Sequence, residues 1–233
     1  MGEKTRIVIA LDFTDLDEAL GVVEITKDQV DFYKIGSILF TSVGPRAVER
    51  VMSQGKKVFL DLKFHDIPNT VSGAVRGAAA MGVHMLTVHC AGGIEMMRGA
   101  LKGAEAGLRG EAGAARPKII GVTVLTSLAG TGDTPKRVLD YSRDAVAAGI
   151  DGVVCSPLEV GQVKRAWGQK LVAVVPGIRL AEEGRDDQAR VGTPGRAASD
   201  GADFLVVGRS VTGSADPHGT LAKVLREIEG ARR

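Results

Sequence analysis

The chain has 233 residues, of which 44% are hydrophobic and 25% are charged, as is typical of a soluble globular protein. Aromatic residues make up only 4% and glycine accounts for 31 residues, so the core must consist mainly of Val, Ile, Leu and Ala. Such a core favours a parallel α/β fold over an antiparallel sandwich. The net charge of +2, without a long Lys/Arg cluster, gives no reason to expect a nucleic-acid partner.

Two cysteines, Cys90 and Cys155, are too few for a disulfide framework. Both follow apolar runs, so we expect buried thiols rather than metal ligands or nucleophiles. The N-terminal apolar run, 6–11, is too short to span a membrane and lacks a signal-peptide cleavage pattern. We therefore expect a cytoplasmic protein that makes no membrane contact.

Short apolar runs recur at intervals of roughly 25 to 30 residues, and segments with helical spacing lie between them. Strands that alternate with helices in this way predict a (β/α)8 TIM barrel of the α/β class, a single domain over residues 1–233. A helix is expected to start at Asp133-Thr134-Pro135, with proline at an early position. The predicted strands are 7–11, 32–35, 58–60, 85–88, 119–124, 152–155, 171–175 and 204–207.

A doubly wound open sheet is the alternative architecture. Such a sheet usually has fewer strands and often carries a Gly-rich first turn, whereas Asp-Phe-Thr at 12–14 follows the first predicted strand here. No low-complexity segment or interdomain linker interrupts the chain, so the sequence favours the barrel.

Asp61, Lys63 and Asp66 fall within six residues, where a buried strand should give way to a loop. Side chains alternate along an extended segment, so Asp61 and Lys63 should point to the same face. Pro68 is expected to end the extended piece, and a helix to begin near Thr70. Buried charges are costly unless they pair, so a structural salt bridge is one reading and a catalytic site is the other.

Polar residues also follow the other predicted strands, and in a barrel all these ends surround one mouth, where such enzymes place their sites. Asp12, Lys34, Asp61 and Lys63 come from three successive strands. They should form a row of alternating charge in which each group keeps its neighbour ionised. Further strand ends carry His89, Thr126-Ser127, Pro176-Gly177-Ile178-Arg179 and Gly208-Arg209-Ser210.

The last quarter of the chain indicates a phosphate site. Gly208-Arg209 follows the eighth predicted strand and precedes a helix expected near His218, and loops after strands seven and eight commonly bind phosphate in this fold. Arg179 is placed to share the same anion. The segment 180–193 is either a surface loop or a lid that brings Gln188 to the phosphate.

These motifs together resemble the orotidine 5′-phosphate decarboxylase family over nearly the whole chain. The strongest element, Asp61-Leu62-Lys63-Phe64-His65-Asp66-Ile67-Pro68-Asn69-Thr70, is similar to the family's Asp-x-Lys-x-x-Asp signature with its extension. The blocks that agree in order are Ala10-Leu11-Asp12, Tyr33-Lys34-Ile35-Gly36, Val122-Thr123-Val124-Leu125-Thr126-Ser127, Pro176-Gly177-Ile178-Arg179, Asp187-Gln188 and Val207-Gly208-Arg209-Ser210.

The resemblance implies conversion of orotidine 5′-monophosphate to uridine 5′-monophosphate and carbon dioxide, without a metal or organic cofactor. It assigns to Lys63 the stabilisation and protonation of a carbanion at C6 of the pyrimidine. Asp61, Asp66 and Lys34 complete the implied catalytic set. The resemblance also implies a homodimer in which Asp66 and Ile67 serve the partner's site. Implied substrate contacts come from Asp12, Lys34, Asp61, Ile67, Thr70, Thr126, Ser127, Pro176, Arg179, Gln188, Gly208 and Arg209.

Two other functions remain open from the sequence. A magnesium-dependent hexulose-phosphate synthase-like enzyme resembles this family in barrel and signature, but would carry an acidic metal ligand on strand two, where this chain has Lys34. A non-catalytic phosphate-binding barrel would be expected to have lost Lys63 or Asp61. We assign no chemistry to His65 or His89, for which packing is the simpler role.

Overall fold

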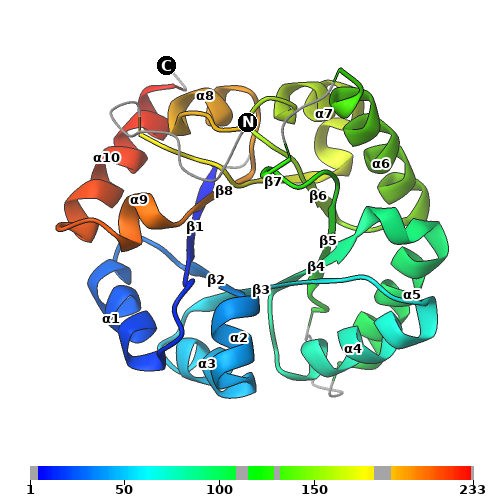
Figure 1. Cartoon of the computed structure of the whole chain (residues 1–233), viewed down its shortest axis with the longest axis horizontal. Coiled ribbons are helices and arrows are strands. Elements are labelled where there is room, and N and C mark those ends of the chain that lie inside the picture. The colour runs from blue at the N-terminus through cyan, green and yellow to red at the C-terminus, as the bar shows by residue number, and fades with distance from the viewer. Residues whose placement is uncertain (1–4, 109–114, 129–131, 181–189, 232–233) are drawn as a thin grey trace.

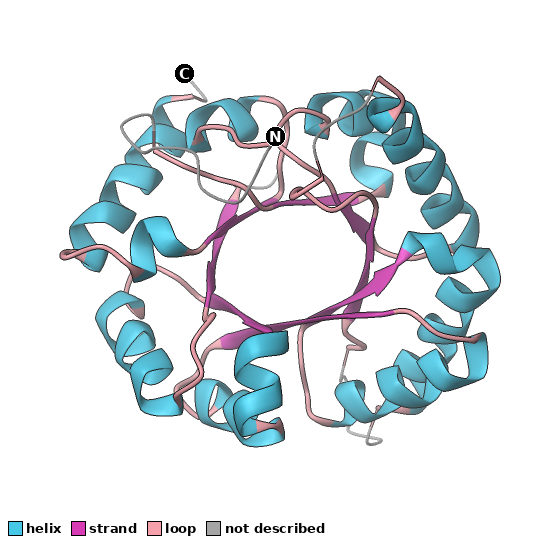
Figure 2. Cartoon of the chain, viewed as in Figure 1, coloured by secondary structure: helices cyan, strands magenta, loops and turns pink. Residues whose placement is uncertain are grey.

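Parallel strands close into a barrel in chain order, with β1 paired to both β2 and β8 (Figures 1 and 2). The computed structural model describes residues 5–108, 115–128, 132–180 and 190–231. The closed ring confirms the predicted (β/α)8 barrel and excludes the doubly wound sheet. Its eight strands within the described ranges are β1 (Arg6–Ala10), β2 (Phe32–Gly36), β3 (Lys57–Phe64), β4 (Met85–His89), β5 (Lys118–Val122), β6 (Gly152–Val154), β7 (Val172–Val175) and β8 (Phe204–Val207).

Helices surround the ring of strands on its outer side (Figure 2). Within the described part of the chain, none combines the length and the apolar character that a membrane crossing requires. The α-helices are α1 (Leu16–Thr26), α2 (Ser37–Val43), α3 (Pro45–Met52), α4 (Pro68–Ala80), α5 (Gly93–Ala106), α6 (Thr134–Ala148), α7 (Val160–Trp167), α8 (Pro194–Ser199), α9 (Arg209–Thr212) and α10 (Pro217–Gly230), and the 3₁₀ turns are η1 (Cys90–Gly92) and η2 (Gly168–Lys170).

The element boundaries differ most from the sequence prediction at two places near the barrel mouth. Strand β3 continues to Phe64, beyond the predicted end at Leu60, so Asp61 and Lys63 lie on the strand itself and Asp66 follows it. A short helix, α9, begins at Arg209 directly after β8, ahead of the helix expected near His218.

Two apolar layers hold the barrel together. A large cluster fills the space between the strands and the helices, and a smaller one belongs to the alternate side chains that face the barrel interior. The interior cluster contains Val8, Ala10, Phe32, Phe59, Met85, Ile120, Val174, Phe204 and Val206. Cys90 and Cys155 lie buried in the outer cluster, as expected, and burial raises the pKa of both thiols to about 12.

Helix α4, which follows the charged signature, packs closely against α5. Glycines on α5 make this approach possible, because a side chain at these positions would meet the α4 backbone. A Cβ at Gly99 would lie 2.7 Å from the Pro68 carbonyl oxygen, and one at Gly103 would overlap the Ser72 carbonyl. The small residues of α5 therefore fix where α4 starts.

We expect Gly103→Ala to destabilise the protein by about 1–3 kcal/mol, because the new methyl group overpacks the α4–α5 contact. Gly21→Ala on α1 is the matched control, because a Cβ there meets nothing within 4 Å and alanine should stabilise a helix interior by about 0.5–1 kcal/mol. Urea unfolding midpoints measure both changes. Equal effects of the two substitutions would contradict the close approach.

Candidate active site

Charged side chains follow the apolar interior layer of the barrel at the carboxyl ends of β1, β2 and β3. Residues two apart in a strand share a face, so Lys34 lies beyond Phe32 and Asp61 lies beyond Phe59 on the interior side. Asp12 occupies the corresponding position after β1. The same alternation that buries the apolar layer therefore aims these charges into the mouth.

The four charged groups of the predicted row are in ionic contact. Lys34 Nζ lies 2.9 Å from Asp12 Oδ1 and 3.7 Å from Asp61 Oδ2, and Lys63 Nζ lies 2.8 Å from the same Asp61 oxygen. The side chains of Lys34 and Asp61 are each only 12% exposed, so water screens their interaction weakly. Gly36 leaves the necessary room, since a Cβ there would lie 2.9 Å from Lys34 Nζ.

The backbone of β3 is distorted at Lys63. The pairing register between β3 and β4 shifts between Leu60 and Phe64, and Lys63 has a φ of 50°, the only positive value outside glycine within the described residues. A left-handed conformation is unfavourable for a residue with a side chain and persists only where its surroundings enforce it. Asp61 and Lys63 both line the cavity, and the distortion lies between the regular part of β3 and its end.

Thr87 on β4 connects the distorted backbone to the central carboxylate. Its hydroxyl accepts a hydrogen bond from the Lys63 backbone N–H and donates one to Asp61 Oδ1, both at 2.9 Å. Thr87 is fully buried. The sequence prediction missed this residue, because a single threonine inside an apolar run is ordinary in a strand. The available signal was its position opposite the charged signature in the predicted barrel.

Asp61 is held ionised by its neighbours. Burial alone would raise the pKa of this carboxyl group, but Lys34, Lys63 and the Thr87 hydroxyl outweigh that effect, and the net pKa is lowered. Because the pKa is lower in the folded state, the ionised group contributes stability above its unfolded pKa, and this contribution is lost as the pH falls through the folded pKa.

A cavity of about 490 Å³ opens at this end of the barrel, a size suited to a small organic ligand. The charge row forms one wall, and apolar strand residues form the floor. The lining includes Asp12, Lys34, Ile38, Asp61, Lys63, Val124, Leu125, Thr126, Pro176, Gly177, Arg179, Gly208, Arg209 and Thr212. Ile38 and Thr212 were not singled out by the sequence, because both lie in helices that follow the strands.

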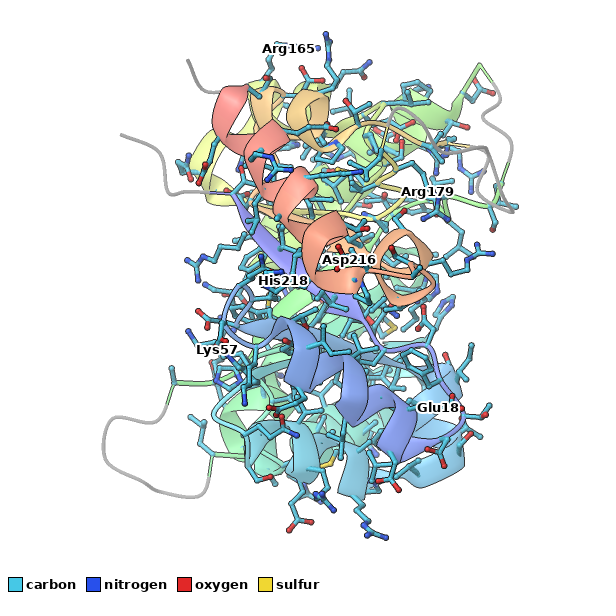
Figure 3. All side chains as sticks on the ribbon, turned by 90° about the vertical axis from the view of Figure 1, so that its left-hand side faces the viewer. Glu18, Lys57, Arg165, Arg179, Asp216 and His218 are labelled. Atoms are coloured by element: carbon cyan, nitrogen blue, oxygen red, sulfur yellow. The ribbon has the colours of Figure 1, made fainter. Side chains whose placement is uncertain are left out.

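Two arginines lie on the side of the cavity formed by the ends of β7 and β8. Arg179 is buried, and its Nη1 donates a 3.1 Å hydrogen bond to Ser210 Oγ, which joins the two strand ends. Arg209 is exposed and lines the same cavity. Figure 3 shows Arg179 at one end of the barrel and Lys57, at the start of β3, at the other end. The mouth therefore offers cationic donors suited to an anion such as phosphate.

A family model described as "Orotidine 5'-phosphate decarboxylase / HUMPS family" matches residues 5–224. The chain belongs to this family. The match covers every strand of the barrel and both arginines of the mouth, so the resemblance read from the sequence motifs is confirmed.

Relatives within the family are similar over nearly their full length. A protein from Nostoc sp. named orotidine 5′-phosphate decarboxylase is 40% identical, over 96% of this chain and 97% of its own. One of the same name from Legionella pneumophila strain Corby is 42% identical, over 96% and 99%. The crystal structure of orotidine 5′-phosphate decarboxylase from Lactobacillus acidophilus superposes with a TM-score of 0.83, at 33% identity, over 97% of this chain and 99% of that one.

The cavity brings together most, but not all, of the residues that the family resemblance implies. Asp66, Ile67, Thr70 and Ser127 are exposed and do not line it. Gln188 falls outside the described residues. The remaining implied residues line the cavity: Asp12, Lys34, Asp61, Lys63, Thr126, Pro176, Arg179, Gly208 and Arg209.

The histidines near the row do not reach the cavity lining. The rings of His65 and His89 lie 5.2 Å apart between centroids. Burial, with smaller contributions from His65 and Lys63, lowers the pKa of His89, which favours the neutral ring. A neutral, partly buried ring agrees with the packing role expected for His89.

Across the described ranges, no group of three or more His, Cys, Asp or Glu side chains is arranged to hold a metal ion. The carboxylates of the mouth, Asp12 and Asp61, already face the Lys34 ammonium at 2.9 and 3.7 Å. A divalent cation bound to these oxygens would lie beside that ammonium, and the repulsion disfavours such a site.

We expect Thr87→Val to lower the free energy of unfolding at pH 7 by about 1–3 kcal/mol, because it leaves the Lys63 N–H and one Asp61 oxygen without this partner. The loss should shrink as the pH falls and Asp61 becomes protonated, since the hydroxyl then no longer stabilises a charge. Urea unfolding at pH 7 and at a series of pH values below 3.8, the ordinary pKa of the carboxyl group, measures how the loss changes. Thr87→Ser, which keeps the hydroxyl, is the control, and a loss independent of pH would contradict the assignment.

Proposed function

We propose that this protein decarboxylates orotidine 5′-monophosphate to uridine 5′-monophosphate, the last step of UMP synthesis, and does so in the cytoplasm. Family membership and relatives at about 40% identity support the reaction. The observation that carries it is the Lys63 ammonium, held 2.8 Å from Asp61 in the cavity that Arg179 and Arg209 line. One cavity thus combines a proton donor with two arginines that are suited to bind a phosphate group.

Lys63 acts at the reacting carbon in this proposal. Cleavage of the bond between C6 and the carboxylate releases carbon dioxide and leaves the electron pair in the plane of the ring at C6, where it is poorly delocalised. The Lys63 ammonium stabilises this charge and then transfers a proton to C6, and it regains a proton from solvent. Asp61 holds the Lys63 ammonium in the cavity before the reaction, through the ion pair at 2.8 Å.

Fixed charges supply the larger part of the rate enhancement. Enzymes lower barriers by roughly 8–23 kcal/mol, and a poorly stabilised carbanion requires the upper part of this range. The row from Asp12 to Lys63 is ordered before the substrate arrives, so little reorganisation is needed in the transition state. Repulsion between Asp61 and the substrate carboxylate is a further contribution of the kind called ground-state destabilisation.

The substrate lies across the cavity with its phosphate towards Arg179, Arg209 and the Gly208 backbone, and its base towards Thr126. Pro176 packs against the base, and the family resemblance assigns Gln188, which lies outside the described residues, to the phosphate. Asp12 and Lys34 contact the ribose hydroxyl groups. Binding energy from the distant phosphate helps to order the site, so these contacts should affect turnover as well as affinity. Ser127 would reach the pyrimidine only after a rearrangement of its loop, since it does not line the cavity.

Two copies of the chain form the complete enzyme in this proposal. Asp66 and Thr70 are exposed and Ile67 is 66% exposed, although all three belong to the family signature. Ile67 follows Asp66 directly, so both exposed side chains are accessible to a second copy of the chain. We assign Asp66 and Ile67 to the partner's site, where Asp66 would complete the charge row.

Lys63→Ala should reduce conversion of orotidine 5′-monophosphate by about a thousandfold or more, because both the carbanion's counter-charge and its proton donor are lost. The decrease in substrate absorbance with purified protein in excess chelator measures this effect. Wild-type turnover should be unchanged by the chelator, since no cofactor is proposed. Lys164→Ala, which breaks a 2.8 Å pair with Asp203 on another face, is the control and should retain turnover. Turnover that the chelator abolishes would instead favour a magnesium-dependent sugar-phosphate enzyme.

Mixing the inactive Asp66→Ala and Lys63→Ala variants should restore activity if each site uses residues from both copies. A mixed dimer then contains one site with both defects and one intact site, so equal mixing with free exchange restores about a quarter of wild-type activity. The measurement is the turnover rate after the mixture has been incubated for subunit exchange. Absence of recovery, with mixed dimers present by native mass spectrometry, would place Asp66 in its own chain's site.

A further inference from the structure

Arg190 forms a buried ionic connection among three loops at the mouth of the barrel. Its side chain is 3% exposed, and Nη1 lies 2.8 Å from Oε1 of Glu159, which is 4% exposed. Nη2 donates hydrogen bonds to the carbonyl oxygens of Val124 at 2.9 Å and Leu125 at 3.0 Å. A charge buried this deeply is retained only where it is paired and hydrogen-bonded, as here.

The carbonyl groups that Arg190 binds belong to the residues directly before Thr126. Val124, Leu125 and Thr126 all line the cavity, and Leu125 and Thr126 lie outside any regular element, with no strand partner to fix them. The guanidinium group is planar and donates in fixed directions, so it fixes the position of this loop relative to the cavity. Arg190 therefore acts on the part of the mouth assigned to the pyrimidine.

Glu159 anchors the other end of the connection. Its second oxygen, Oε2, accepts hydrogen bonds from the backbone N–H and the hydroxyl of Ser156, which follows β6. Glu159 lies just before α7, and Ser156 is fully buried. The ion pair is thus fixed to the loop between β6 and α7, and Arg190 cannot move without breaking it.

The backbone that carries Arg190 is tied to the phosphate side of the cavity. Two residues further on, Gly192 accepts a hydrogen bond from the Arg179 N–H at 3.0 Å and donates one to the Gly177 carbonyl at 3.1 Å. The loops concerned follow β5, β6 and β7, which are neighbours in the barrel (Figure 1). Arg190 consequently joins the loop of Thr126 to the segment of Arg179.

We propose that Arg190 is a positioning residue that sets Thr126 relative to the phosphate-binding Arg179, so that a nucleotide's base is held at the correct distance from its phosphate. This inference rests on the proposed function, because it takes the pyrimidine side of the cavity to be at Thr126. It assigns no contact between Arg190 and the substrate. Its effect is on recognition of the base, and the phosphate contacts remain.

The test uses a double variant, Arg190→Met with Glu159→Gln, which removes both charges and so avoids leaving one buried and unpaired. Calorimetry measures the Kd for uridine 5′-monophosphate and for ribose 5-phosphate, which lacks the base. The Kd for the nucleotide should rise about tenfold or more, as expected for a misplaced polar contact, while the Kd for ribose 5-phosphate stays within about twofold. Equal losses for both ligands, or no loss for either, would overturn the proposal.

A control variant removes a similar pair at the opposite end of the barrel. Arg116→Met with Asp151→Asn eliminates a pair at 2.6 Å between the start of β5 and the segment before β6. This pair is 27% and 21% exposed, so its removal should lower stability less than in the Arg190 variant, and both ligand affinities should be retained. A base-selective loss in the control as well would show that lowered stability, rather than position, causes the effect.

A second measurement separates this inference from the proposed function. Thr126→Ala is made in the wild type and in the Arg190→Met/Glu159→Gln variant, and its effect on nucleotide affinity should be much smaller in the latter, because coupled residues are not additive. Additive effects would mean that Arg190 does not act through Thr126. Wild-type protein that binds neither ligand and does not turn over substrate would refute the proposed function itself, and this inference with it.

Discussion

The mouth of the barrel depends on one buried carboxylate. Asp61 is charged in a place where burial opposes charge, and it is kept so by Lys34, Lys63 and the Thr87 hydroxyl. Removal of any of these partners changes the balance for the others, because interactions in a low-dielectric network are not independent. The chemistry assigned to Lys63 is therefore a property of the network, although Lys63 alone reaches the reacting carbon.

The barrel separates stability from chemistry along its axis. Apolar side chains such as Phe32 and Phe59 fill the interior, and two residues further along the same strands the side chains become Lys34 and Asp61. Because the strand period is two, a single pattern of alternation produces both layers. The apolar layer offsets the cost of gathering like and unlike charges in the mouth, and variation in the loops leaves that layer intact.

The sequence was sufficient for the barrel and for the charge row, because both follow from local regularities. Strand periodicity locates Lys34 and Asp61, and the carboxyl ends of parallel strands must meet. The distortion at Lys63 could not be foreseen, since only the register between two strands reveals it. The position of Thr87 opposite the signature could have been noticed, but its two hydrogen bonds depend on that same register. Arg190 gave no signal, because a charged residue after a polar segment is ordinarily solvated, and only its burial indicates a role.

The left-handed backbone at Lys63 has a consequence for attempts to transfer this site to another scaffold. A design that copies only the three charged residues of the signature onto a regular strand would place the amine at a different height and angle. The irregular pairing with β4 and the Thr87 hydroxyl would have to be transferred together with the charged residues. The smallest part of this active site that could be transferred is the pair of adjacent strands β3 and β4, and a short linear motif is not sufficient.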